Sequence, residues 1–301
     1  MTNIKTNTYS LFNGDCLDIM RNIPDKSIDM ILCDLPYSIT QNHWDCEIPL
    51  NDYVLINNKR VKKQDYFLNK ALDGLSKKEI DALWQSEKIN GLWSYYNRII
   101  KDNGIIILFS QDMFSAKLMN SNEKMYRYKL YWEKDRPSGF LNAKRMPLKN
   151  VEEILIFYKK LPPYNPQFWE GKPLHGMGKK YKIEGHLANN NYGNFPSHLN
   201  PSANRKGDTK KYPRQILRFN RPHPPIHPTQ KPTDLCSWLI KSFSIDGATI
   251  LDNTMGSGTV GISVLEVGEN RKFIGIEQND TYFNIAKERI ENFYKSKKIE
   301  P

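Results

Sequence analysis

The sequence predicts an α/β fold, in which buried strands alternate with helices, and two stretches carry this prediction. The first is an apolar run, Ile28 and Met30–Cys33, which stops abruptly at Asp34–Tyr37, with the sequence D-L-P-Y. The second is Thr249–Leu251, which leads through an acid into the glycine loop Gly256–Gly258. Short apolar runs that end at turn residues are typical of buried strands in such sheets. Ligands bind at the carboxyl ends of these strands, so each stretch is a candidate binding site.

The D-L-P-Y turn has the chemistry of a site for a flat, polar substrate. Asp34 can accept hydrogen bonds, Pro36 stiffens the turn through its fixed φ, and Tyr37 can stack on a ring. The alternative interpretation is an ordinary turn that ends a strand.

The glycine loop is followed by an acid at a spacing that indicates a nucleoside site. A second predicted strand, Lys272–Ile276, ends at Glu277, 21 residues after Gly256. At this spacing a βαβ unit binds ribose hydroxyls. The sequence lacks the lysine of a phosphate-binding loop and a complete G-x-G-x-x-G, so a nucleoside without phosphates fits better than a nucleotide. An ordinary βαβ corner is the alternative.

The charge of the chain is concentrated in one segment. The 301 residues, enough for one large domain or two, carry a net charge of +11. Between Lys159 and Arg221 there are 13 lysines and arginines and three acidic residues, a net charge of +10. A concentrated basic segment is expected of a polyanion-binding protein, and a merely soluble basic face is the alternative.

Cysteine usage and hydropathy predict a reduced, cytosolic protein. The four cysteines form no C-x-x-C and have no histidine partner at zinc spacing, so we expect neither disulfides nor a metal. The amino terminus is polar, and no stretch approaches 18 consecutive apolar residues. We therefore expect no association with a membrane.

The chain before residue 159 is predicted to alternate strands and helices. The predicted strands are Tyr9–Phe12, Ile28–Cys33, Ile105–Phe109, Tyr126–Trp132 and Val151–Tyr158, and the predicted helices are Cys16–Ile23, Leu92–Ile100 and Met113–Met119. Ser38–Glu47 should form a loop over the site, Asn103-Gly104 a turn, and Glu133–Asn150 a basic loop. Residues 49–88 are polar, with a capping box at Ser76 and Glu79, and are expected to form a helical insertion.

From Lys159 to Arg221 the sequence has almost no periodic apolar pattern. Seven prolines interrupt it, and eight aromatic residues lie among the basic ones. Lysine and arginine neutralise phosphates and aromatic rings stack on bases, so an irregular, loop-rich segment that binds nucleic acid fits this composition. Disorder is the alternative, but the aromatic content argues against it. Periodic structure resumes at His227–Pro232 and in a predicted helix, Asp234–Phe243.

Three motifs together resemble a known family. D-L-P-Y at Asp34–Tyr37, H-P-T-Q-K-P at His227–Pro232 and D-N-T-M-G-S-G at Asp252–Gly258 occur in this order. The chain resembles a β-group DNA amino-methyltransferase of the adenine-N6, D-P-P-Y type, which uses S-adenosylmethionine. The likeness covers nearly the whole chain except 49–88. Two departures exist: Leu35 replaces the usual first proline, and Asn253–Met255 replaces the commoner proline-phenylalanine stretch.

The resemblance implies a Rossmann-like class I methyltransferase with a circularly permuted motif order. We expect a mixed, mostly parallel sheet flanked by helices, together with a loop-rich target-recognition region. Residues 1–158 would form the catalytic half, with the insertion at 49–88, residues 159–221 would recognise the target, and residues 222–301 would form the cofactor-binding half.

The resemblance also implies the reaction, which is transfer of a methyl group to the N6 amine of an adenine flipped out of duplex DNA. The Asp34 carboxylate and the Leu35 carbonyl would accept hydrogen bonds from the amine, Pro36 would shape the turn, and Tyr37 would stack on the base. Amine methylation needs no covalent cysteine, and the chain has no proline-cysteine pair.

The remaining site residues follow from the same resemblance. Asp252 and the glycine loop would hold the methionine end of the cofactor, with Lys231 nearby, Glu277 would bind the ribose, and Asp15 the adenine amine. The predicted cofactor-binding residues are Asp15, Cys16, Asp34, Thr229, Gln230, Lys231, Pro232, Asp252, Asn253, Thr254, Met255, Gly256, Ser257, Gly258, Glu277 and Gln278. The predicted DNA-binding residues are Trp44, Lys134, Arg136, Lys144, Arg145, Lys179, Lys180, Arg205, Lys206, Lys210, Lys211 and Arg214. As alternatives, Asp15 is a turn cap and Lys231-Pro232 a helix-start signal.

Three other functions are compatible with parts of this pattern. They are cytosine-N4 methylation, protein-glutamine methylation and nucleic-acid binding without catalysis on a degenerate methyltransferase fold. Aspartate at position 34 favours adenine, since relatives that act on cytosine usually carry serine there. The expected partner is double-stranded DNA in a bacterial or phage-derived setting. The sequence leaves open a homodimer and a cognate restriction endonuclease of a restriction-modification system.

Overall fold

The structure is a computed structural model that describes residues 3–37, 47–56, 59–62, 76–173, 207–226 and 229–299. The chain divides into two compact units. One comprises Met1–Asn165 and Gln215–Pro301, and the other comprises Pro166–Arg214.

The first unit is built on a mixed, mostly parallel sheet, which confirms the predicted fold class. Within the described residues it has nine strands, in the spatial order β1 (Asn3–Lys5), β2 (Tyr9–Asn13), β13 (Lys272–Glu277), β12 (Thr249–Asp252), β3 (Ile28–Asp34), β6 (Ile100–Ser110), β8 (Lys149–Phe157), β7 (Tyr126–Ser138) and β11 (Ile216–Arg218). Strands β1 and β8 run antiparallel to the strands beside them, and the other neighbours are parallel.

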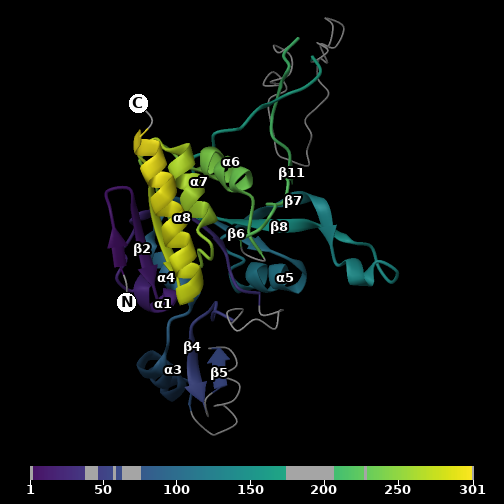
Figure 1. Ribbon diagram of the computed structural model, residues 1–301. Helices are drawn as coiled ribbons and strands as arrows, with labels where there is room; N and C mark the ends of the chain where they lie inside the picture. The colour runs from purple at the N-terminus through teal and green to yellow at the C-terminus, as the bar shows by residue number, and fades with distance from the viewer. Residues whose placement is uncertain are drawn as a thin grey trace, which may run out of the picture. The chain divides into compact units, whose positions relative to one another are not determined.

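Helices cover both faces of this sheet (Figure 1). One face carries α6 (Thr233–Phe243), α7 (Thr259–Val267) and α8 (Asp280–Ile299), and the other carries α1 (Cys16–Met20), α4 (Leu92–Ile99) and α5 (Asp112–Ser121). Along β3, Met30 and Leu32 belong to the first hydrophobic core and Ile31 and Cys33 to the second. Because side chains alternate between the faces of a strand, a strand buried on both faces reads as a continuous apolar run.

The sheet topology brings the two sequence motifs together. Strands β12 and β3 are parallel neighbours, with Ile250 opposite Met30. From β12 the chain continues through α7 to β13 on one side, whereas from β3 it continues to β6 on the other. The carboxyl ends of β12 and β3, at Asp252 and Asp34, therefore meet at a topological switch point, where open α/β sheets bind ligands.

The insertion at 49–88 differs from the helical prediction. It contains an antiparallel hairpin of β4 (Tyr53–Ile56) and β5 (Lys59–Lys62) before the helix α3 (Lys77–Glu87). The β-branched residues in Tyr53–Ile56 and at Val61 suit a strand, and the prediction gave too little weight to them. The capping box is confirmed, because the Ser76 side chain accepts from the Glu79 amide and the Glu79 carboxylate accepts from the Ser76 amide.

Two further predictions were wrong in detail. The predicted turn at Asn103-Gly104 lies inside β6, where the pairing with β3 is irregular, since Ile28 is opposite Ile100 but Met30 is opposite Ile105. An irregularity of this kind accommodates turn-forming residues without ending the strand.

The predicted loop Glu133–Asn150 is largely a hairpin. Strand β7 continues to Ser138, β8 begins at Lys149, and a short 3₁₀ turn, η1 (Phe140–Asn142), lies between them. The charged residues of this stretch gave the pattern of a loop, because the outer part of the hairpin is exposed and has no buried face.

The second unit combines aromatic and basic residues. In its described parts, β9 (Trp169–Glu170) pairs antiparallel with β10 (Lys210–Lys211). The Trp169 indole donates to the Tyr212 carbonyl at 3.1 Å, and the Arg214 guanidinium lies 5.2 Å from the centroid of the Trp169 ring. Arginine and an aromatic ring that stack in this way present the two groups with which proteins contact phosphates and bases.

Three of the four cysteines, Cys16, Cys33 and Cys236, are buried free thiols, and Cys46 lies outside the described residues. Across the described ranges, no helix has both the length and the apolar character needed to span a bilayer. The same residues contain no cluster of three or more histidine, cysteine, aspartate or glutamate side chains that could hold a metal ion.

Candidate active site

A cavity of about 670 Å³ lies at the carboxyl ends of β3 and β12. Its lining includes every predicted catalytic residue and every predicted cofactor-binding residue except Pro232 and Gly258. Pro232 is buried at the start of α6, and Gly258 lies at the start of α7. Residues from distant parts of the chain are therefore brought into one site.

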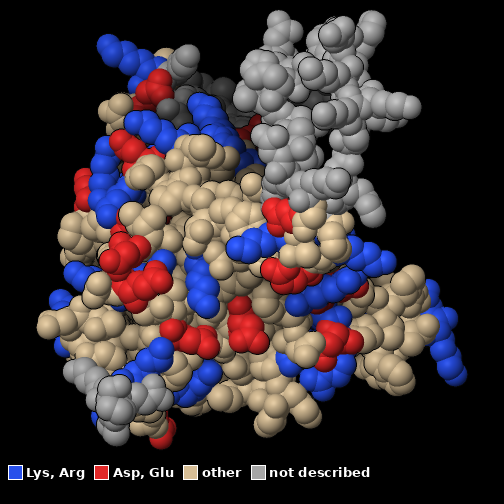
Figure 2. All heavy atoms as spheres, turned by 90° about the horizontal axis from the view of Figure 1, so that it is seen from above, with Lys and Arg blue, Asp and Glu red and all other residues tan. Residues whose placement is uncertain are grey.

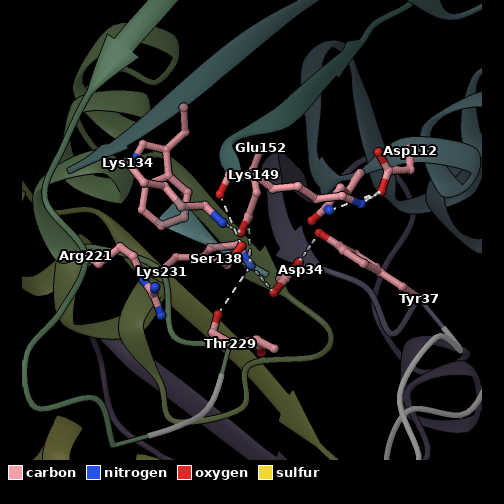
Figure 3. A network of polar contacts seen from close by, with 12 residues as sticks. Asp34, Tyr37, Asp112, Lys134, Ser138, Lys149, Glu152, Arg221, Thr229 and Lys231 are labelled. Carbon is pink, nitrogen blue, oxygen red and sulfur yellow. Dashed lines mark hydrogen bonds and ion pairs between the residues drawn. The ribbon is translucent and has the colours of Figure 1, made fainter. Parts of the chain in front are cut away.

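Asp34 is the last residue of β3, and both of its carboxylate oxygens are hydrogen-bonded (Figure 3). The Tyr37 hydroxyl donates to Oδ1 at 2.8 Å, and Lys231 Nζ donates to Oδ2 at 2.5 Å. The Thr254 hydroxyl donates to the Asp34 backbone carbonyl at 3.0 Å. All three sequence motifs therefore meet at Asp34.

A row of alternating charges extends from Asp34 into the cavity wall. Lys231, whose side chain is only 8% exposed, lies 2.5 Å from Asp34 and 3.4 Å from Glu152 Oε2. Glu152 Oε1 in turn lies 2.5 Å from Nζ of Lys134, whose side chain is 7% exposed. Each buried charge therefore has an opposite partner, which burial of charges requires.

Burial and the ion pairs act on the pKa values in opposite directions. Burial raises the pKa of Asp34 above its ordinary value, although the nearby Lys231 ammonium opposes this rise. Burial also acts to raise the pKa of Glu152, but Lys231 and Lys134 together hold it below its ordinary value. Burial disfavours the charged form of Lys231, yet the two carboxylates raise the pKa of Lys231 above its ordinary value. Lys231 therefore stays protonated and supports the ionised form of Asp34.

The other side of the cavity is formed by acids whose oxygens bind backbone amides. Glu277, at the end of β13, accepts from the Gly256 amide at 2.9 Å and from the Asn279 amide at 2.8 Å. Asp252 accepts from the Thr254 amide at 3.1 Å. Burial raises the pKa of Glu277 and raises the pKa of Asp252 well above its ordinary value. These contacts fix the glycine loop between two carboxylates.

Asp15 and Cys16 lie where β2 passes into α1. The Asp15 side chain caps this helix by accepting from the amides of Leu17 at 2.8 Å and Asp18 at 3.2 Å. The cap that the sequence offered as an alternative is therefore present, and Asp15 also lines the cavity. Burial raises the pKa of the Cys16 thiol to about 12, so this residue is a neutral part of the wall.

Two features of the cavity fit a polar cofactor. In the part of the chain that the structure describes, Thr259 Oγ1 is a buried oxygen in the cavity wall with no hydrogen-bond partner. A Cβ atom built on Gly256 would meet no atom within 4 Å, so the loop faces open space there. Buried polar atoms are nearly always hydrogen-bonded, so the Thr259 hydroxyl is suited to bind a ligand.

Sequence reasoning missed three residues of the site. The Phe109 ring lies 5.2 Å from Lys231 Nζ, and the Trp132 ring lies 5.3 Å from Lys134 Nζ. Both rings stand where predicted strands end, Ile105–Phe109 and Tyr126–Trp132, so their position at the carboxyl edge could have identified them. Glu152 could have been noticed as an acid that immediately precedes the apolar core of a strand.

The predicted DNA-binding residues fall into three groups. Lys134 alone forms the first group: it lies in the cavity wall, where its ammonium pairs with Glu152 and its side chain is 7% exposed. Exposed residues of the β7–β8 hairpin and residues of the second unit form the next group, which comprises Arg136, Lys144, Arg145, Lys210, Lys211 and Arg214. The third group lies outside the described residues and comprises Trp44, Lys179, Lys180, Arg205 and Lys206; His227 and Pro228 of the H-P-T-Q-K-P motif lie outside them as well.

The chain is similar to known DNA methyltransferases in sequence. Residues 28–288 match the N6/N4 methyltransferase family described as DNA methylase. The type II methyltransferase M.BglII of Bacillus subtilis is 24% identical over 290 residues, which are 94% of this chain and 69% of that protein.

Two solved structures share the fold at low sequence identity. The cytosine-N4-specific PvuII DNA methyltransferase has a TM-score of 0.56 and 13% identity, with 97% of this chain and 93% of that chain covered. The M1.HpyAVI–SAM complex has a TM-score of 0.52 and 20% identity, with 93% of this chain and 99% of that chain covered.

The two glycines of the loop should respond differently to substitution by alanine. Both have positive φ, +50° at Gly256 and +79° at Gly258, but only at Gly258 would a Cβ collide, 3.0 Å from the Ala286 Cβ. We expect Gly256→Ala to lower the free energy of unfolding by about 1 kcal/mol and Gly258→Ala by about 2 kcal/mol or more, measured by urea denaturation.

Binding measurements separate the two glycines further. Because its new methyl group would enter the cavity, Gly256→Ala should weaken binding of S-adenosylmethionine in calorimetry. Equal losses of stability in the two variants, or wild-type affinity in Gly256→Ala, would contradict this geometry.

Proposed function

Because the chain belongs to the family of N6/N4 DNA methylases, we propose that it transfers a methyl group to the N6 amine of adenine at a specific site in duplex DNA. Membership of this family makes the protein a DNA methyltransferase, and it agrees with the three motifs from which the family was predicted. The choice of adenine and the role of each residue are proposals. The observation that carries them is the Asp34 carboxylate, held by Tyr37 and Lys231 beside the glycine loop in one cavity.

A base inside a duplex cannot reach this cavity, so the target nucleotide must be flipped out of the stack. The cavity of about 670 Å³ has the size of a ligand site. The lone pair of the adenine amine is delocalised into the ring, which makes the amine a poor nucleophile. The Asp34 carboxylate and the Leu35 carbonyl would accept its two N–H groups, draw the nitrogen toward a tetrahedral geometry and free its lone pair.

The methyl donor is S-adenosylmethionine, and when bound it supplies a methyl group activated by a positively charged sulfur. Glu277 is suited to bind the ribose hydroxyls, because each carboxylate oxygen can accept a second hydrogen bond beside those from Gly256 and Asn279. The Thr259 hydroxyl and the open face of Gly256 supply further contacts. Much of the catalysis would come from holding the amine in line with the methyl group.

Lys231 would act through Asp34. Its ammonium stabilises the ionised form of a carboxylate whose burial favours protonation. A protonated Asp34 would lose acceptor capacity toward the amine, so the pair keeps Asp34 in the form that the reaction needs. The Tyr37 hydroxyl fixes the orientation of the same carboxylate, in addition to the stacking proposed for its ring.

Mass spectrometry of nucleosides from the DNA of a host that expresses the protein tests the proposal directly. N6-methyladenine at one sequence motif is the expected result. N4-methylcytosine in its place would show that cytosine is the target base, while methyl transfer to an exocyclic amine would still hold. A purified protein that binds DNA but transfers no label from S-adenosylmethionine would overturn the activity itself.

Asp34→Ala should abolish transfer and leave cofactor binding largely intact. Removal of a preorganised hydrogen-bond partner of a transition state costs about a hundredfold or more in rate. Transfer of radioactive label to DNA measures the loss, and calorimetry measures cofactor binding. Asp246→Ala, an exposed aspartate before β12, is the matched control and should retain activity. Near-normal turnover in Asp34→Ala would refute the assigned role.

Lys231→Met should move the acidic limb of the pH profile of kcat/KM to higher pH. Burial already raises the Asp34 pKa and Lys231 opposes the rise, so loss of the cation raises this pKa further. Because the reaction needs ionised Asp34, activity should then be lost at a higher pH as the solution is acidified. Lys241→Met, on the exposed side of α6, should leave the limb in place. An unshifted limb in Lys231→Met would contradict the pairing.

Neutralising Lys210, Lys211 and Arg214 together should weaken DNA binding and flatten its salt dependence. In a plot of the logarithm of the binding constant against the logarithm of salt concentration, the slope should become less steep by about 0.9 for each phosphate contact removed. Fluorescence anisotropy over a range of salt concentrations measures this slope. Three exposed lysines of the first unit provide a control triple: Lys124 before β7, Lys272 at the start of β13 and Lys295 in α8. An unchanged slope in the first triple variant would remove these residues from the interface.

A further inference from the structure

The β7–β8 hairpin carries two large apolar side chains at its tip. The hairpin extends beyond the rest of the sheet, at the right of Figure 1, and turns through η1. Phe140 is 80% exposed and Leu141 is 98% exposed, so almost none of their surface is covered by the protein. Single exposed apolar residues are common, but two adjacent ones at the end of a projecting element indicate an interaction surface.

The residues that form this tip carry only positive charges. From Arg136 to Asn150 the chain has four lysines and arginines and no acidic residue. Arg136, Lys144 and Arg145 are exposed. Arg136 pairs with the neighbouring Asp135 at 3.2 Å, and Lys149 forms an ion pair with Asp112. In Figure 2 the hairpin reaches the right edge of the molecule, with blue side chains at its outer end. The apolar tip is therefore surrounded by groups that bind phosphates.

The tip is also continuous with the proposed active site. Trp132, Lys134 and Ser138 of β7 and Glu152 of β8 line the cavity. Ser138 precedes Phe140 by two residues and the chain turns at Gly139, so at most about 7 Å of chain separates them. Base pairs stack at about 3.4 Å, so a duplex whose target base occupies the cavity has neighbouring base steps within reach of the tip.

We propose that Phe140 and Leu141 enter the duplex beside the target nucleotide and fill the space in the stack that the flipped base leaves. This inference rests on the proposed function, since it requires a flipped base in the cavity. Flipping removes stacking and pairing contacts and exposes the faces of neighbouring bases. Apolar side chains that wedge between bases replace part of that contact and exclude water. Arg136, Lys144 and Arg145 hold the hairpin against the phosphates on either side.

The surrounding charge favours DNA over a second copy of this chain. Two hairpin tips placed together would bring Lys144 and Arg145 of each copy against those of the other, and the nearby Asp135 already pairs with Arg136. Like charges at close range oppose such contact. A duplex with a flipped base offers the exposed faces of the neighbouring bases to the apolar residues and its phosphates to the surrounding cations.

A duplex with 2-aminopurine in place of the target adenine tests the proposal, once the methylated motif has been found by sequencing. The double variant Phe140→Ala/Leu141→Ala should give a smaller rise of fluorescence on binding than the wild type. On the ordinary duplex it should lose about tenfold or more in kcat/KM. Its affinity for S-adenosylmethionine should be unchanged. Ile245→Ala, an exposed apolar residue before β12, is the matched control and should behave as the wild type.

A second substrate separates wedging from simple contact. When the target adenine lies opposite an abasic position, flipping costs less, so the double variant should recover most of its lost kcat/KM. Equal losses on the paired and unpaired duplexes, or an unchanged fluorescence signal, would overturn the wedge. A change of oligomeric state in sedimentation, caused by the double substitution, would assign the tip to a second copy and also overturn it. If the wild type methylates no DNA, the proposed function itself is wrong. Failure of the wedge is a different result, in which the wild type methylates DNA and the double variant behaves like it.

Discussion

The buried ion pair between Lys231 and Asp34 is the interaction on which the site depends. It joins a residue after β11 to the end of β3, and it pairs an ammonium whose side chain is 8% exposed with a carboxylate whose side chain is 23% exposed. An unpaired charge at this depth would be strongly destabilising, so each group requires the other. Glu152 also needs opposite charges beside it, and it forms ion pairs with Lys231 on one side and Lys134 on the other. The wall of the cavity is thus held in place electrostatically.

The sheet makes this pairing possible. Strands β3 and β12 are neighbours, so the Thr254 hydroxyl can donate to the Asp34 carbonyl across 220 residues of sequence. A second link lies beneath, where the Tyr96 hydroxyl of α4 donates to Asn253 Oδ1 at 2.6 Å. The glycine loop and the D-L-P-Y turn are consequently fixed relative to each other before any ligand binds. Such preorganisation lets the site position a methyl group against an amine without rearrangement.

The sequence predicted the parts of the fold that are buried on both faces. Strands β3, β12 and β13 appear as apolar runs bounded by turn residues, and the acids at their carboxyl ends line the cavity. The β4–β5 hairpin was missed because its β-branched residues were given too little weight, and the outer part of β7–β8 was missed because it is exposed and its charged residues resemble a loop. The role of Glu152 could not be read from β8 alone. It arises because β8 lies between β6 and β7, which is a property of the whole sheet.

The two departures from the family pattern have physical explanations in this structure. The Leu35 side chain is buried in the hydrophobic core beneath the turn, while the proposed role of this position uses its backbone carbonyl. Met255 packs against Gly275, where a Cβ would lie only 2.4 Å from the Met255 Sδ, and its amide donates to the Ile276 carbonyl at 2.9 Å. At both positions the side chain packs in the hydrophobic core. Leucine and methionine can therefore replace the commoner residues as long as they fill the same space, whereas the role proposed for Asp34 uses its side chain, so this position would have no such freedom.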